Sequence, residues 1–318
     1  MKNYLVGLDI GSTTVKIAVL DNKGNIIHKQ YERHYSDIRN TVTEIIKNSY
    51  EKLNESSIKI SITGSGAIDV SKYLGITFVQ EVAASTRAIE KYIPGTDVVI
   101  ELGGEDAKIT YLSGNLEQRM NGSCAGGTGA FIDQMAVLMK TDAVGLNELS
   151  KRHKTIYPIA SRCGVFAKSD IQPLLNEGAR QEDIAASIFQ AVVNQTISGL
   201  AQGRPIKGNV AFLGGPLFFL SELRERFKET LNLSSENAIC PEDANYYVAI
   251  GAALLATDNE EISFNEFYKK IENTMENTSI EYRKKDLEPL FENKEQYNKF
   301  LERHDKNKAK QKSIHEYN

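Results

Sequence analysis

The segment 8-LDIGSTTVK-16 combines a short apolar run, an acidic residue and a turn of glycine and hydroxyl residues. The apolar residues predict a buried strand, and Asp9 stands near its end, just before the turn. A second segment, 100-IELGGEDAK-108, repeats the order of strand, carboxylate, glycine turn and strand, and Glu101 follows Asp9 by 92 positions. Repetition of one supersecondary unit predicts a fold made of two related halves.

Both turns carry groups that suit a magnesium–nucleotide complex. Glycine allows phosphate to approach backbone N–H groups, and the hydroxyls of Ser12, Thr13 and Thr14 add donors. A carboxylate can hold Mg²⁺, usually through water, and Lys16 on the next strand can face a terminal phosphate. One such turn is more often a plain hairpin. Two of them, followed by 213-LGGP-216 before a helix, predict a nucleotide clamped between two halves, with the third turn against adenosine.

The composition excludes several classes of protein. The chain has 318 residues, of which 41% are hydrophobic and 25% charged, and this is typical of globular proteins. A net charge of −4 predicts no broad surface for nucleic acid or anionic lipid. The start is no signal peptide, because Asp9 interrupts its short apolar run, and no run of about 18 apolar residues predicts a membrane span. We therefore expect a cytoplasmic protein that binds neither nucleic acid nor a membrane.

The apolar patterns predict an α/β chain in three parts. Residues 1–95 form the first half, residues 96–257 the second, and residues 258–318 a charged helical tail. A helix of small residues at 245–257 is expected to pack back on the first half. Other helices are expected at 37–53, 80–92, 129–140, 145–152, 165–176, 181–200 and 217–231. Neither a GxxxxGK[ST] loop nor a GxGxxG turn after the first strand is present.

Two of the three cysteines stand at predicted helix starts. Cys124 lies in 122-GSCAGGTGAF-131 and Cys163 in 161-SRCGVFAKSDI-171. The N–H groups at a helix start lower a thiol pKa, so these residues are candidate nucleophiles, redox thiols or metal ligands. Cys240, beside a proline, is expected to be a small packed residue. Two thiolates do not complete a four-coordinate metal site, but a two-fold axis would gather four around one [4Fe–4S] cluster.

The turns together resemble the actin, sugar kinase and Hsp70 superfamily. With both cysteine segments, the chain specifically resembles the BadF/BadG/BcrA/BcrD ATPase family of activators of 2-hydroxyacyl-CoA dehydratases. The matching segments are GLDIGSTTVK, ELGGEDAK, NGSCAGGTGAF, SRCGVFAKSDI, FLGGP and GAALLA, within about residues 3–257. The resemblance implies an actin-like ATPase fold with duplicated ribonuclease-H-like domains, extended here by the C-terminal tail.

The resemblance also implies a mechanism and a set of site residues. It implies a homodimer with one bridging [4Fe–4S] cluster, which uses ATP and Mg²⁺ to pass an electron at very low potential. The acceptor would be a reductive iron–sulfur enzyme, the donor a ferredoxin or flavodoxin, and the host anaerobic. The implied catalytic residues are Asp9, Lys16 and Glu101, and the implied cluster ligands are Cys124 and Cys163. The implied nucleotide-binding residues are Gly11, Ser12, Thr13, Thr14, Gly103, Gly104, Glu105, Gly126, Gly127, Thr128, Gly214, Gly215 and Pro216.

This chain departs from the family pattern at two positions, because the family usually has Asp at the place of Glu101 and often Gln at that of Glu105. Two other functions stay open. A small-molecule kinase, similar to N-acetylhexosamine kinases, would need a carboxylate base such as Asp69 or Asp106. A nucleotide-sensing scaffold would bind ATP without further chemistry. Both alternatives leave the paired thiols unexplained. We further expect the glycine loop after Cys124 to lie between nucleotide and cluster and to couple them.

Overall fold

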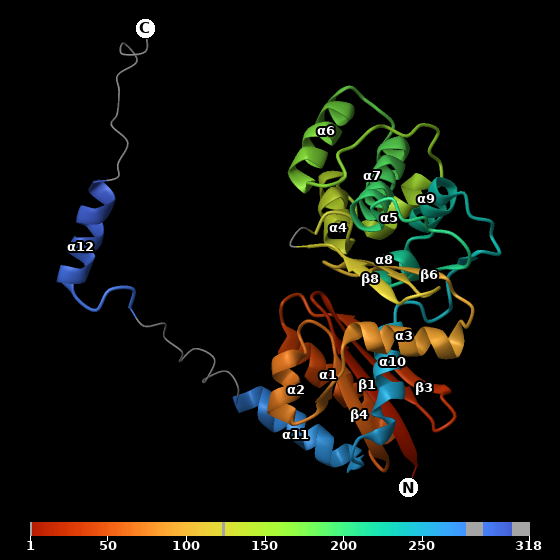
Figure 1. The fold of residues 1–318 in the computed structure, drawn as a ribbon. Helices are drawn as coiled ribbons and strands as arrows, with labels where there is room; N and C mark the ends of the chain where they lie inside the picture. The colour runs from red at the N-terminus through yellow and green to blue at the C-terminus, as the bar shows by residue number, and fades with distance from the viewer. Residues whose placement is uncertain (1, 123–124, 278–288, 307–318) are drawn as a thin grey trace. The chain divides into compact units, whose positions relative to one another are not determined.

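The computed structural model describes residues 2–122, 125–277 and 289–306. The chain divides into a compact unit, Met1–Met275, and a second unit, Glu276–Asn318, whose described part contains helix α12 (Lys294–Asp305). The first unit contains two β-sheets with helices packed on both (Figure 1).

The first sheet comes mainly from the N-terminal part of the chain. Its strands are β1 (Asn3–Ile10), β2 (Thr14–Leu20), β3 (Ile26–Arg33), β4 (Ser57–Thr63), β5 (Thr77–Phe78) and β11 (Ile262–Ser263). Strands β1, β2 and β3 are antiparallel neighbours, and β4 runs parallel to β1 on its other side. Three helices follow these strands in the chain: α1 (Ile38–Leu53), α2 (Ile68–Leu74) and α3 (Glu81–Tyr92). The side chain of Asp37 caps α1 by accepting the Asn40 N–H.

The second sheet repeats this arrangement. Its strands are β6 (Val98–Leu102), β7 (Ala107–Tyr111), β8 (Glu117–Met120), β9 (Val210–Leu213) and β10 (Ala238–Ile239). Again three antiparallel strands come first and the fourth runs parallel to the first, giving the order β10-β9-β6-β7-β8. Its helices are α4 (Gly129–Leu138), α5 (Ala143–Ser150), α6 (Gly164–Asn176), α7 (Gln181–Thr196), α8 (Gly215–Phe219) and α9 (Ser221–Leu231).

The predicted internal repeat is confirmed at the level of single residues. In the first hairpin Asp9 pairs with Lys16, and in the second Glu101 pairs with Lys108. Each lysine therefore follows its carboxylate by seven positions, and the two pairs are 92 positions apart. The same turn closes both hairpins, since Gly11 N–H donates to the Thr14 carbonyl at 2.9 Å and Gly103 N–H to the Asp106 carbonyl at 2.7 Å.

Helix α10 (Tyr247–Leu255) packs between β1 and α3 in the first half. Small residues make this possible, because a Cβ atom at Gly7 would collide with the Ala249 carbonyl and one at Gly251 with the Ala84 carbonyl. Buried residues of this helix share a core with residues of both sheets, including Ala18 and Leu20 from the first and Val99, Ala211 and Leu213 from the second. This shared core joins the two halves.

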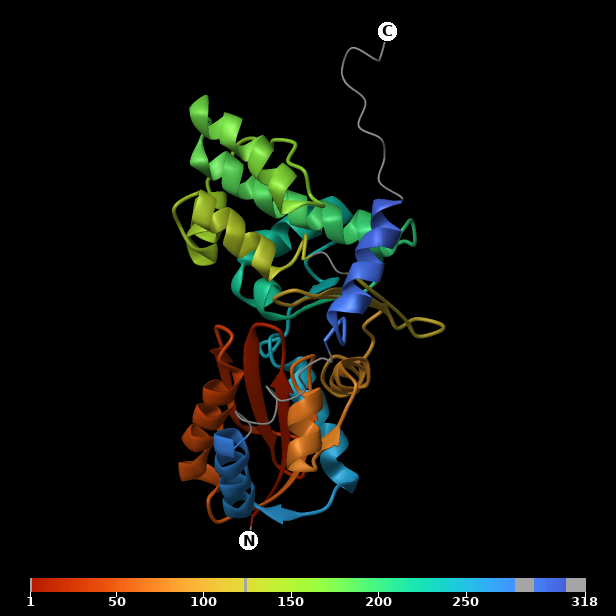
Figure 2. The same cartoon turned by 90° about the vertical axis from the view of Figure 1, so that its left-hand side faces the viewer.

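The segment expected to be a charged tail begins inside the compact unit. Strand β11 pairs with β4, and helix α11 (Phe264–Asn277) lies beside the first sheet on the side of α1 (Figures 1 and 2). Phe264, Phe267 and Ile271 are fully buried there, and Phe264 packs on the Tyr50 ring at 6.2 Å. The apolar residues of FNEFYKKI therefore face a core, although the charged residues around them predicted a separate tail.

Other differences from the sequence-based elements are local. The helix expected at 217–231 is two helices, because Leu220 adopts extended backbone (φ −107°, ψ 92°) and Arg224 donates to the Phe218 carbonyl at 2.9 Å. The helix expected at 181–200 ends at Thr196 and continues as a π-helical turn, Ile197–Ala201. The short elements α2, β5 and β10 were not predicted, and β8 was expected only as the second strand of a hairpin at 113–115. In β8 the sequence EQRM shows no apolar alternation.

Among the described residues, one stretch, Gln181–Ala201, is long and apolar enough to cross a membrane. In this fold 67% of its apolar window is buried, as in the core helix of a folded domain.

Candidate functional site

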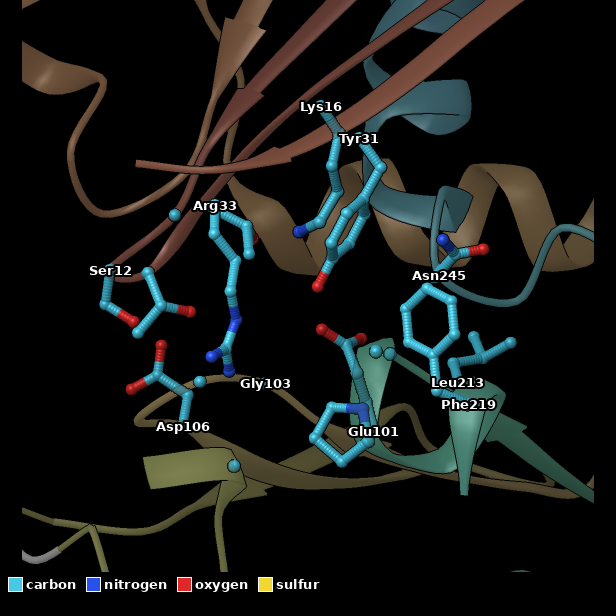
Figure 3. A pocket seen from close by; sticks show the side chains of 18 of the residues that line it. Ser12, Lys16, Tyr31, Arg33, Glu101, Gly103, Asp106, Leu213, Phe219 and Asn245 are labelled. Atoms are coloured by element: carbon cyan, nitrogen blue, oxygen red, sulfur yellow. The ribbon is translucent and has the colours of Figure 1, made fainter. Parts of the chain in front are cut away.

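A pocket of about 380 Å³ lies between the two sheets of the first unit (Figure 3). Its walls come from the ends of β1 and β6, from the turns that follow them, and from α4, α5, α8 and the start of α10. Twelve of the predicted site residues line it: Asp9, Gly11, Ser12, Thr13, Thr14, Lys16, Glu101, Gly103, Gly104, Gly214, Gly215 and Pro216.

The two repeated turns meet at this pocket. The side chain of Thr13 in the first turn lies so close to Gly104 in the second that a Cβ atom at residue 104 would collide with it. Gly214 adopts a positive φ of 90°, which favours glycine, and a Cβ there would meet the Leu102 carbonyl. The backbone of all three glycine turns is therefore close to the same space.

Each repeated hairpin carries a buried ion pair on the pocket wall. Lys16 Nζ lies 2.7 Å from Asp9 Oδ2, and burial raises the pKa of Asp9 although Lys16 opposes the shift. In the second hairpin Lys108 contacts Glu101, at 3.4 Å, and Glu81 from the start of α3. Burial lowers the pKa of Lys108, but the two carboxylates outweigh it and hold the pKa well above its usual value. Both lysines therefore carry positive charge in the pocket.

Helix α4 begins directly on the second turn. The N–H groups of Gly129 and Ala130 donate to the carbonyls of Gly103 and Gly104, at 3.0 and 2.8 Å. These bonds satisfy two of the N–H groups that a helix start leaves unpaired. One turn further along α4, Asp133 binds Arg33 of β3 at 2.6 Å, and both residues line the pocket. Both halves therefore contact α4 at the pocket: the second half through its glycine turn and the first half through Arg33.

The segment after Cys124 packs against the segment before Cys163. A Cβ atom at Gly126 would collide with the carbonyl oxygen of Arg162, so only glycine permits this contact. Cys124 itself lies outside the described residues. The loop that contains Gly126 leads straight into α4, and α6 begins just after Cys163. The two cysteine segments are therefore neighbours within one chain.

Cys163 has the environment predicted for it. It is the N-cap residue of α6 and half-buried, and the N–H groups of Phe166 and Val165 lower the pKa of its thiol. Cys240 differs, because burial raises the pKa of its thiol and it packs against a hydrophobic core. Within the described residues, no group of three or more His, Cys, Asp or Glu side chains could hold a metal ion.

The sequence matches the BadF/BadG/BcrA/BcrD ATPase family over residues 6–256. The chain belongs to this family. It is 31% identical to the 2-hydroxyisocaproyl-CoA dehydratase activator of Clostridioides difficile over 83% of this chain and 98% of that protein. It is 30% identical to the (R)-2-hydroxyglutaryl-CoA dehydratase activating ATPase of Acidaminococcus fermentans over 80% of this chain and 98% of that protein.

Solved structures agree with the family assignment. The activator of the 2-hydroxyisocaproyl-CoA dehydratase from Clostridium difficile, with bound ADPNP, superposes with a TM-score of 0.68 at 27% identity, over 85% of this chain and 97% of that one. Component A of the Acidaminococcus fermentans (R)-2-hydroxyglutaryl-CoA dehydratase gives 0.69 at 27% identity, over 85% and 99%. The predicted actin-like ATPase fold is confirmed, and the protein is an ATPase of the BadF/BadG/BcrA/BcrD family.

Four residues predicted to bind the ATPase's nucleotide do not line the pocket. Glu105 lies in the second turn and is exposed. Gly126, Gly127 and Thr128 lie in the loop before α4, where the Thr128 hydroxyl donates to the Ala125 carbonyl at 2.5 Å. These three residues belong to the connection between the pocket and the cysteine segments.

Of the two carboxylates considered as a kinase base, Asp106 lines the pocket, and burial raises its pKa. Asp69 is exposed on α2, 3.8 Å from Lys72.

Sequence reasoning missed several residues of the pocket: Tyr31, Arg33, Glu81, Lys108, Asp133, Phe219 and Asn245. Lys108 could have been predicted from the sequence, because it lies 92 positions after Lys16, which is the spacing of the internal repeat. No comparable signal marks Glu81, which begins a helix, or Asn245, which precedes one.

Proposed function

We propose that this ATPase is an electron-transferring activator, which uses ATP to activate a reductive iron–sulfur enzyme of the 2-hydroxyacyl-CoA dehydratase kind. In this proposal two copies of the chain hold one [4Fe–4S] cluster with Cys124 and Cys163 from each. The observation that carries it is the position of Cys163 at the N-cap of α6, where the backbone N–H groups of Phe166 and Val165 lower the pKa of its thiol. Two relatives, each matched over 98% of its own length, are named as activators of such dehydratases.

The residues around Cys163 suit a thiolate ligand. A lowered thiol pKa favours the deprotonated form that binds iron. Its half-buried position leaves the sulfur within reach of a second chain. The contact between Gly126 and Arg162 keeps the two cysteine segments of one chain close together. When bound, such a cluster supplies a one-electron carrier that the protein can hold at low potential.

At the nucleotide end, we propose that the two repeated turns bind the phosphates. Backbone N–H groups of the turns and the charged amines of Lys16 and Lys108 would neutralise phosphate oxygens. Asp9 and Glu101 would orient Mg²⁺ and the attacking water. Glu101 is one methylene longer than Asp9 and is paired with Lys108, so it would hold Mg²⁺ or orient water differently from its counterpart.

We further propose that α4 links nucleotide state to the cysteines. Its first N–H groups bind the second phosphate turn, and the loop before it packs on the residue preceding Cys163. A shift of that turn on phosphate release would move α4 and the Cys124 segment together. Bistable helix positions of this kind are a general means of switching. The remaining partners in this proposal are a ferredoxin or flavodoxin as electron donor and the dehydratase-like acceptor.

The decisive experiment is an iron and sulfide determination on protein purified and reconstituted without oxygen. We expect about four irons and four sulfides per dimer with a broad visible absorption band. Cys124→Ala and Cys163→Ala should each lose the cluster, whereas Cys240→Ala is the matched control and should keep it. A dimer that stays colourless after reconstitution, or a full cluster in Cys163→Ala, would contradict the proposal.

A further inference from the structure

Three cationic side chains of the described residues line the pocket: Lys16, Lys108 and Arg33. Lys16 and Lys108 are equivalent members of the internal repeat, each paired with the carboxylate of its own hairpin. Arg33 comes from β3, and the position 92 residues after it is Ala125, so the repeat supplies no equivalent cation there. One cation of the pocket therefore stands outside the repeat.

The backbone of Arg33 is fixed against the first glycine turn. Arg33 pairs with Thr14 across strands β2 and β3. The next residue, His34, donates its N–H to the Thr13 carbonyl at 3.1 Å, and Nε2 of its buried ring hydrogen-bonds the Gly11 carbonyl at 3.2 Å. The side chain of Arg33 therefore starts from a defined place beside a turn that we expect to bind phosphate.

The guanidinium of Arg33 is more accessible than either lysine amine. The Arg33 side chain is 44% exposed, compared with 16% for Lys16 and 8% for Lys108. Its partner Asp133, at 2.6 Å, is 38% exposed and lies on α4 in the second half. Exposed ion pairs are weak, so the guanidinium can exchange Asp133 for a stronger anion at little cost.

Arg33 stands at one end of the pocket. In Figure 3 it lies on the side of Ser12 and Asp106, whereas Leu213 and Phe219 lie on the opposite side. Leu213 begins the third glycine turn, which we expect to contact adenosine. With adenosine at that turn, the phosphate farthest from it, the terminal phosphate of ATP, comes closest to Arg33.

We propose that Arg33 binds the terminal phosphate of ATP and returns to Asp133 when that phosphate is absent. The planar guanidinium offers two parallel N–H groups to phosphate oxygens, and a terminal phosphate carries more negative charge than a carboxylate. ADP lacks this group, so Arg33 keeps its pair with Asp133 when ADP is bound. The proposal rests on the proposed placement of the phosphates between the repeated turns and is independent of the iron–sulfur cluster.

The exchange also changes how α4 is held. Asp133 belongs to α4, whose first N–H groups bind the second glycine turn. With ATP bound, Arg33 leaves Asp133 and α4 keeps only its contacts within the second half at this point. With ADP bound, the ion pair joins α4 to the first half again. Arg33 thus gives α4 different contacts in the two nucleotide states, which a nucleotide-driven switch requires.

Binding of ADP and of ADPNP, a non-hydrolysable ATP analogue, to two variants of the full chain tests the proposal. In Asp133→Asn the arginine has no carboxylate partner, so adding Arg33→Gln removes only its contact with the nucleotide. We expect this second substitution to weaken ADPNP binding about 10- to 100-fold, the range for a hydrogen-bonded charge, and ADP binding by about fivefold or less. Equal losses for the two nucleotides, or no loss for either, would overturn the proposal.

A second arginine of the first half provides the matched control. Arg87 on α3 is 53% exposed, pairs with Glu90 at 3.6 Å and lies outside the pocket. Arg87→Gln, made in the same Asp133→Asn protein, should leave both affinities within about twofold. An equal loss of ADPNP binding in this control would refute the proposal, because net charge and not the Arg33 contact would then set the affinity. If the wild-type protein binds neither nucleotide, the placement of the phosphates between the repeated turns is wrong as well.

Discussion

The thiols of Cys163 and Cys240 lie in opposite surroundings. Helix N–H groups lower the pKa of Cys163, and burial raises that of Cys240. The same side chain is therefore prepared for metal or redox chemistry at one position and for packing at the other.

We expect the two thiols to differ in alkylation when the reduced protein carries no cluster. Iodoacetamide attacks the thiolate, so labelling of Cys163 should rise at a pH below about 8.5, the ordinary thiol pKa, and labelling of Cys240 above it. Peptide mass spectrometry over a pH series measures both in one sample. In urea the two curves should merge, because the folded surroundings are gone. A folded Cys163 that labels at the higher pH would contradict this assignment.

Single residues of the pocket could be predicted where a short sequence pattern marks them. Asp9, Lys16 and the glycines stand next to strands in short patterns, so the sequence was enough to place them on the pocket. Glu81 and Asn245 reach it from helix ends far along the chain, and their contacts depend on packing between elements. A single sequence holds no local trace of such contacts.

At the scale of elements, α4 is held between the halves. Its N-terminus binds the second turn, and Asp133 on its first turns binds Arg33 of β3. This ion pair is 44% and 38% exposed, so its contribution to stability is small, at most about 1 kcal/mol. Its carboxylate nevertheless stands on the wall of the pocket in which we propose that phosphate binds.

We expect Asp133→Asn to tighten ADP binding by about two- to fivefold while the thermal midpoint changes little. The change removes a negative charge beside the phosphates and frees Arg33 to face them. Titration of ADP at low and at high salt checks the cause, since the gain should shrink as salt screens the charges. Weaker ADP binding in the variant would mean that Asp133 positions Arg33 and does not compete for it.

Elements were predicted well where the apolar pattern is long. The repeated strands, α1, α3, α7 and α10 lie close to where periodicity placed them. The break at Leu220 was not visible, because a single extended residue leaves the helical spacing of FFLSELRERF nearly unchanged. Strand β11 and helix α11 were assigned to a tail because charge outweighs their few apolar residues, although those residues are fully buried.

At the scale of the whole molecule, the chain separates at residue 275 and not at 258. The consequence is that β11 and α11 contribute to the stability of the ATPase unit. Full burial of Phe264, Phe267 and Ile271 is worth about 1.5–3 kcal/mol for each side chain. Their sum is comparable with the total stability of many proteins, about 5–15 kcal/mol.

Truncation tests this boundary. A chain ending at Met275 should keep most of the free energy of unfolding of the full chain, because the residues removed lie in the second unit. A chain ending at Asp258 should lose about 5 kcal/mol or fail to fold, since it leaves an apolar face of the first sheet bare. Urea unfolding of the three proteins gives the comparison. Equal midpoints for the two truncated chains would show that α11 is only an appendage.

The repeated turns also affect the direction in which a phosphate chain can bind between them. A cradle built from two identical copies would receive a linear phosphate chain equally well either way round. Within the two turns, this symmetry is broken where the copies differ, and one such position is Thr14, whose counterpart 92 positions later is Asp106. A hydroxyl tolerates an anion and a carboxylate repels it. We therefore expect the differences between the two copies to help set the direction in which a nucleotide binds.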